Sequence, residues 1–124
     1  GAVTTSETTT NKPVAGSSHN LVTAATTNIA VIKATAGNLY ETVVSNVTAT
    51  PVYVKLYNKA TAPVLTTDVP VVTIPVPANS ISSFNFGTIG KRFTLGISIS
   101  VTGAIGATDV TNAVAGVQIN STYL

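Results

Sequence analysis

"PVYVKLYNKATAPVLTTDVPVVTIPVP", residues 51–77, begins with the clearest alternation near the middle of the chain. Apolar side chains take every second position, and tyrosine and lysine take the positions between them. The apolar row is Val52, Val54 and Leu56, and the other row is Tyr53, Lys55 and Tyr57. A period of two is typical of a half-buried strand, because successive side chains leave opposite faces. This stretch therefore predicts a strand with one face in a core.

The rest of the quoted stretch predicts a loop and a second strand. Residues 58–70 contain Asn58, two prolines and Asp68, all of which are turn formers. Residues 71–76 resume as an apolar run that includes Pro75, and Pro77 follows it. Proline cannot donate to a ladder of hydrogen bonds. We therefore expect the second strand to lie at a sheet edge or to end early.

Strand patterns continue on both sides of this stretch at the short spacing of sandwiches and barrels. We expect the strands at 28–35 and 39–47 to form a hairpin around Gly37 and Asn38. In the strand at 92–102, the core-facing row is Phe93, Leu95, Ile97, Ile99 and Val101. The remaining strands are expected at 21–25, 80–86 and 116–124.

No segment keeps a helical period for three turns, so the pattern predicts an all-β fold. The segment at 103–116 is expected to be a long loop with at most one helical turn. About eight antiparallel strands favour a β-sandwich, either jelly-roll-like or, as the alternative, immunoglobulin-like. We expect the sandwich domain to span residues 21–124.

Residues 1–20 are rich in Thr and Ser and contain few large apolar groups, so burial cannot order them on its own. Two interpretations stay open for this segment. It is either a loose terminus or an extended arm that orders only against a neighbouring molecule. His19 is placed in this arm.

The composition points to a surface occupied by partners. The chain has 124 residues, of which 44% are hydrophobic and 8% charged, against about 25% charged residues in a typical domain. Surface charge normally opposes association, so such a chain would tend to associate with other molecules when free in solution. The formal net charge is +2 and no basic stripe is present, so we expect no nucleic-acid partner.

Other compositional features limit the location of the chain. There is no cysteine, and no run of 18 apolar residues that would predict a membrane span. The start carries no signal-peptide pattern. We therefore expect synthesis and assembly in the cytoplasm, with no membrane partner.

The sequence gives no support for an enzyme. Catalysis needs titratable groups placed together, and a triad drawn from His19 with Asp68 or Asp109 has nothing to position it. The two aspartates lie in turn-like contexts, where Asp bonds to its own backbone. No ligand cluster for a metal is present. We predict no catalytic, metal or cofactor site.

The outward row of the first strand offers a binding surface. Tyr53 and Tyr57, with Lys55 between them, could stack on sugar rings. They could instead form a protein interface, because the amphipathic ring of tyrosine suits a partly hydrated contact. The expected interface residues are Tyr53, Lys55, Tyr57 and the basic pair Lys91 and Arg92.

Several motifs resemble a group of small structural proteins of tailed-bacteriophage virions. They are the YVKLYNK strand, the loop with Pro and Asp, the VPVVTIP strand, "FNFGTIGKRFTLGISISVTG" and the final "DVTNAVAG" loop. The resemblance covers residues 28–124. It implies a capsid decoration (cement) protein: a trimeric β-sandwich on the virion surface that binds the assembled major capsid protein. The alternative is a fibre or head-fibre domain that binds host glycans.

Overall fold

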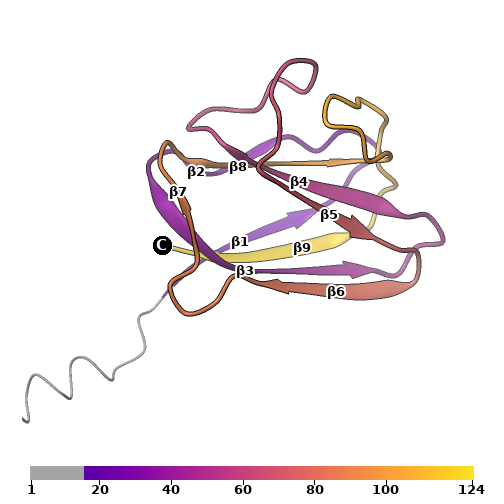
Figure 1. Cartoon of the computed structure of the whole chain (residues 1–124). Helices are drawn as coiled ribbons and strands as arrows, with labels where there is room; N and C mark the ends of the chain where they lie inside the picture. The colour runs from indigo at the N-terminus through magenta and orange to yellow at the C-terminus, as the bar shows by residue number, and fades with distance from the viewer. Residues whose placement is uncertain (1–15) are drawn as a thin grey trace, which may run out of the picture.

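The computed structural model describes residues 16–124, which form nine β-strands and no helix (Figure 1). No element in this part of the chain meets the length and hydropathy of a membrane-spanning helix. The strands are β1 (Ser17–Val22), β2 (Ala30–Lys33), β3 (Gly37–Asn46), β4 (Val52–Asn58), β5 (Val72–Val76), β6 (Ser80–Asn85), β7 (Lys91–Phe93), β8 (Ile97–Thr102) and β9 (Gln118–Tyr123).

The strands form two antiparallel sheets that face each other (Figure 1). We call the sheet with the order β1-β9-β3-β6 sheet A; β7 also pairs with β3 in it. Sheet B has the order β2-β8-β4-β5. The expected all-β antiparallel sandwich is therefore confirmed.

The strand order is that of a jelly roll. The innermost pair is β4 with β5, and around it lie the pairs β3 with β6, β2 with β8 and β1 with β9. β6 pairs with Glu41–Asn46 of β3, and β7 pairs with Gly37–Leu39 on the same side of that strand. Because β6 and β7 act as one interrupted strand, the fold is an eight-stranded jelly roll.

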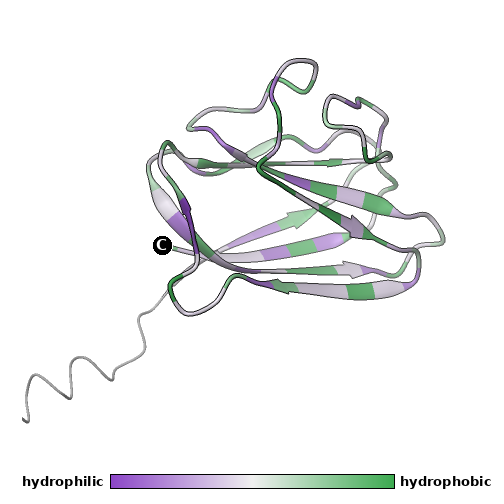
Figure 2. Ribbon diagram, in the orientation of Figure 1, coloured by the Kyte–Doolittle hydropathy of each residue, from purple (hydrophilic) through white to green (hydrophobic). Residues whose placement is uncertain are grey.

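The core lies between the sheets and follows the predicted alternation. Val52, Val54 and Leu56 of β4 are fully buried, and they pack with the inward rows of β3, β8 and β9. Alternating apolar and polar positions are visible along the strands in Figure 2. β5 lies at the edge of sheet B, as its prolines predict, with Pro75 opposite Tyr53.

The hairpin expected at Gly37 and Asn38 is wrong. β2 pairs with β8 in sheet B, whereas β3 lies in sheet A, so the chain crosses between the sheets at residues 34–36. A Cβ on Gly37 would lie 2.5 Å from the carbonyl oxygen of Leu124. This glycine therefore permits the close pairing of β3 with the last residue described, and not a two-strand turn.

The single strand expected at 92–102 is also wrong, because the chain changes sheets within it. β7 belongs to sheet A and β8 to sheet B, and Gly96 lies at the crossing. Leu95, expected in the core, is 60% exposed. A Cβ on Gly96 would lie 2.6 Å from Cα of Ala60, so only glycine fits between the crossing segments.

The predicted domain boundary at residue 20 moves toward the N-terminus. β1 begins at Ser17 and pairs along its length with β9, which makes it an edge strand of sheet A. His19 therefore lies in the sandwich and not in an arm. The rest of the expected arm, residues 1–15, lies outside the described residues.

Candidate functional site

The outer face of sheet B, which points away from the core, is polar and covered. Lys55 and Tyr57 of β4 point to this face, and each has at most 2% of its surface exposed. Three hydroxyl side chains of β8 share the face and are fully buried; they are Ser98, Ser100 and Thr102. Figure 1 shows what covers them: two loops, at 59–71 and 103–116, lie on the far side of sheet B from sheet A.

Hydrogen bonds hold the first loop, 59–71, on the sheet. The Ser98 hydroxyl lies 2.7 Å from the carbonyl oxygen of Lys59 and 2.8 Å from that of Thr61, and it shares its hydrogen between them. Within the loop, Lys59 forms an ion pair with Asp68 at 2.5 Å, and Asp68 also accepts a bond from the backbone N–H of Val64. The hydrogen bond from Lys59 lowers the pKa of Asp68 below its ordinary value.

A buried ammonium group holds the second loop, 103–116. Nζ of Lys55 donates to the carbonyl oxygen of Gly106 at 2.5 Å. Burial lowers the pKa of Lys55, and the charge of Asp109 partly opposes this shift. Asp109 in turn accepts bonds from the N–H and hydroxyl of Thr111, which confirms its predicted role as a turn former.

The five expected interface residues do not form one surface. Tyr53 is half-buried on the outer face of sheet B, whereas Lys91 and Arg92 lie in β7 of sheet A. The prediction that Lys55 and Tyr57 contact a partner is wrong, because the two loops cover both side chains. For Tyr53, Lys91 and Arg92, interface contact stays a prediction.

The sugar platform expected from Tyr53 and Tyr57 is not formed. The Tyr57 hydroxyl lies 3.1 Å from Oγ of Ser100, within the covered polar layer. Burial raises the pKa of Tyr57, although the bond to Ser100 opposes that shift. The ring is therefore covered and cannot stack on a ligand.

The two loops expose aliphatic side chains on their solvent side, and Figure 2 shows apolar segments in both. Each of these side chains is between 48% and 69% exposed. We call this set the aliphatic loop surface; its members are Val64, Val69, Val71, Ile105 and Val110. Sequence reasoning predicted both segments as loops but missed this property, because alternation and turn residues say nothing about which loop side chains remain exposed.

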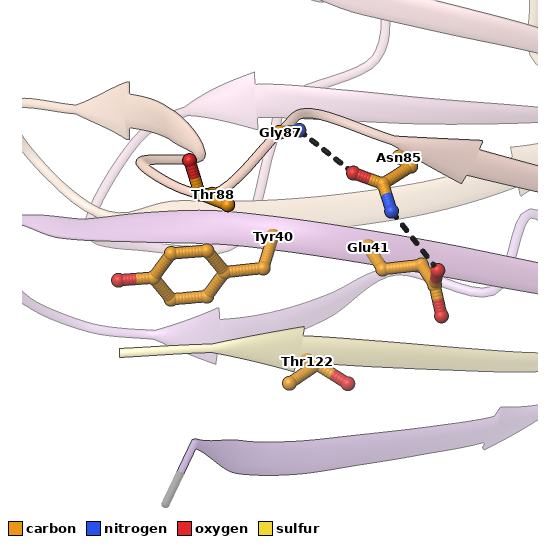
Figure 3. A pocket seen from close by; sticks show the side chains of 6 residues that line it. All are labelled: Tyr40, Glu41, Asn85, Gly87, Thr88 and Thr122. Carbon is orange, nitrogen blue, oxygen red and sulfur yellow. Dashed lines mark hydrogen bonds between the residues drawn. The ribbon is translucent and has the colours of Figure 1, made fainter. Parts of the chain in front are cut away.

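A second feature is a depression on the outer face of sheet A, which we call the Tyr40 depression (Figure 3). Its volume is about 410 Å³. The lining comes from β3, from β6 with the loop after it, and from β9; the residues are Tyr40, Glu41, Asn85, Gly87, Thr88 and Thr122.

A β-bulge in β3 creates the lining of this depression. Leu39 lies opposite Tyr123 and Glu41 opposite Thr122, so Tyr40 is an extra residue in the ladder with β9. A bulge of this kind re-aims side chains. Leu39 and Thr42 are buried, while the two residues between them, Tyr40 and Glu41, line the outer depression together. Strict alternation would place only one of the two there, so sequence reasoning could not find this arrangement.

The residues considered for catalysis are far apart. His19 points to the inner side of sheet A, opposite the buried Ser121, while Asp68 and Asp109 lie in the loops outside sheet B. Nδ1 of His19 is buried and has no hydrogen-bond partner among residues 16–124. The same part of the chain contains no group of three or more His, Asp or Glu able to hold a metal ion.

No protein-family model matches the chain, and no curated protein matches it.

Proposed function

We propose that this chain is a capsid decoration protein of a tailed bacteriophage. It binds the assembled lattice of the major capsid protein at the virion surface and acts as a homo-oligomer, with a trimer favoured by the resemblance. The proposal assigns no catalytic step, cofactor, nucleic acid or membrane to the chain. Its support comes from the sequence resemblance, the jelly-roll sandwich and, above all, the aliphatic loop surface.

The aliphatic loop surface carries the proposal. Exposed apolar groups gathered on one side of a small protein are typical of interaction sites. The charged groups of these loops are engaged within the molecule: Lys59 pairs with Asp68, and Asp109 bonds to Thr111 beside the buried Lys55. A surface with few free charges and several aliphatic groups suits the core of a protein interface.

The attachment of the loops favours binding as well. Bonds from Ser98 to the first loop and from Lys55 to the second fix both backbones on sheet B before any partner arrives. Ordering a loop on binding costs free energy, and a loop that is already ordered avoids this cost. The loops are therefore suited to dock as a preformed surface.

Such docking would stabilise a capsid by linkage. A protein that binds the assembled lattice and not the free subunit shifts the equilibrium toward the lattice. Several copies linked in one oligomer would add effective concentration to each contact. The rival function is glycan binding through Tyr53 and Tyr57. It is disfavoured, because Tyr57 is buried and the two rings cannot form a stacking surface.

The test is co-sedimentation with shells assembled from the major capsid protein of the virus that encodes the chain. Val69→Asp and Ile105→Asp place a charge on the aliphatic loop surface without touching the core, since both side chains are exposed. We expect both variants to fold and to lose shell binding by at least about tenfold.

Val47→Asp and Ile89→Asp are the matched controls. Val47 and Ile89 are also exposed aliphatic residues, but they lie outside the two loops: Val47 follows β3, and Ile89 lies in the turn between β6 and β7. Both controls should bind shells as the wild type does. Full binding by the loop variants, or equal loss in the controls, would contradict the assignment of this surface.

A further inference from the structure

We propose that the Tyr40 depression binds a neutral saccharide, a function separate from shell binding. A second hollow of about 290 Å³ adjoins it and shares Tyr40, Thr88 and Thr122. The two hollows therefore meet at one aromatic residue, and Gly16 and Leu124 complete the lining of the second. Because the hollows share lining residues, they form one groove, and its volume is in the size range of ligand pockets.

The lining matches the chemistry of a sugar ring. The Tyr40 ring offers a flat apolar face for the C–H groups of a pyranose, and its hydroxyl provides a polar end. The Glu41 carboxylate has two oxygens that accept bonds from sugar hydroxyls, and the Asn85 amide both donates and accepts. The hydroxyls of Thr88 and Thr122 line the same hollow.

Several contacts fix these groups before a ligand binds. Oδ1 of Asn85 accepts a bond from the N–H of Gly87 at 2.7 Å, which directs Nδ2 toward Oε2 of Glu41 at 3.5 Å (Figure 3). A Cβ on Gly90 would lie 3.0 Å from the Tyr40 ring, so the loop backbone packs against that ring. The backbone N–H of Phe86 also bonds to the carbonyl oxygen of Tyr40 at 2.9 Å.

The charge of the lining selects a neutral ligand. None of the residues lining either hollow is basic, and Glu41 is the one charged side chain among them. A carboxylate repels phosphate and sulfate groups and acidic sugars at short range. Polar groups that can bond to hydroxyls, set around one aromatic face, therefore favour an uncharged oligosaccharide.

The test is a ¹⁵N–¹H NMR titration of the full chain with three neutral probes: maltotriose, lactose and chitotriose. A groove with one aromatic face is expected to bind with a Kd of about 1 mM. We expect at least one probe to shift the amide signals of Tyr40, Thr88 and Thr122, while the amides of the aliphatic loop surface stay in place.

Two variants separate binding from folding. Tyr40→Ala removes the ring, and Glu41→Gln keeps the shape but removes the charged acceptor; each should weaken binding at least fivefold. Tyr53→Ala, a tyrosine on sheet B, should leave it unchanged. Absence of shifts at these amides with every probe at about 20 mM, roughly twenty times such a Kd, would overturn the proposal. So would binding by both variants that is as tight as that of the wild type. Because shell binding is tested on the loops over sheet B, either proposal can fail alone.

Discussion

The ammonium group of Lys55 and the carbonyl oxygen of Gly106 lie 2.5 Å apart, although 51 residues separate them in the sequence. This contact joins the outer face of β4 to the second covering loop. Removing a charged amine from water costs free energy, and burial lowers the pKa of Lys55 accordingly. We infer that the contact contributes more to the position of the loop than to global stability.

Replacing Lys55 by methionine should loosen the loop with little global cost. The variant loses a charge-assisted hydrogen bond but is relieved of the desolvation of an ammonium group, so the free energy of unfolding should fall by less than about 2 kcal/mol. Hydrogen exchange at the amides of Gly103 and Asp109, which bond to Thr111 and Gly106, should accelerate. Lys33→Met, a change at a half-buried lysine in β2, is the control and should leave these amides protected. Unchanged exchange in Lys55→Met would contradict the role of the lysine.

Gly96→Ala should destabilise the fold through backbone overlap. The new Cβ would lie 2.8 Å from the carbonyl oxygens of Lys33 and Lys59, and neither atom can move without shifting the crossing between sheets. Overpacking of this kind costs about 1–3 kcal/mol. Gly106→Ala is the control, since its Cβ meets only an ordinary contact at 3.6 Å. Urea denaturation should show a lower midpoint for Gly96→Ala alone; equal midpoints would refute the steric argument.

Ile97→Asp and Leu95→Asp should behave differently although both positions belong to one alternating row. Ile97 is fully buried, so its replacement buries an unpaired carboxylate at a cost of several kcal/mol, comparable to a domain stability of about 5–15 kcal/mol. We expect no cooperative thermal transition in Ile97→Asp. Leu95→Asp should melt near the wild-type temperature because Leu95 is exposed. Loss of folding in both variants would contradict the exposed position of Leu95.

The sequence predicted those features of the fold that depend on the residues of a single strand. The alternation of Val52, Val54 and Leu56 correctly predicted the buried face of β4, and Pro75 correctly predicted an edge position for β5. The alternation could not show where the chain changes sheets, because Leu95 keeps the period while Gly96 bends the chain. Strand partners in a jelly roll are distant in sequence, which is why the hairpin between β2 and β3 was wrong.

The candidate sites were less accessible to sequence reasoning for two physical reasons. The outward direction of Lys55 and Tyr57 was predicted correctly, but only the folded loops determine that both are covered. Tyr40 and Glu41 share a depression because of one extra residue in a ladder. A bulge depends on the partner strand, and the partner of β3 at this point is β9, at the other end of the sequence.

Acid should destabilise the wild type more than the His19→Gln variant. Burial lowers the pKa of His19 below 6.5, so below that pH the unfolded chain binds more protons than the folded chain. The free energy of unfolding should therefore fall as the pH drops from about 7.5 to about 5. His19 is the one histidine of the sequence, and hydrogen bonds keep the pKa of Asp68 and Asp109 below this window. Urea denaturation across the window measures the difference, and identical slopes for both proteins would show that His19 is not desolvated.

Calorimetry of assembled capsid shells with and without the protein tests the central claim most directly. If the chain is a decoration protein, saturating amounts should raise the melting temperature of the shell at a fixed stoichiometry. Linkage gives about 2.7 kcal/mol for each site at a hundred times the Kd. Unassembled capsid subunits should show no shift, and Val69→Asp should raise the shell temperature less than wild type. A shell whose melting is unchanged by excess wild-type protein would contradict the account.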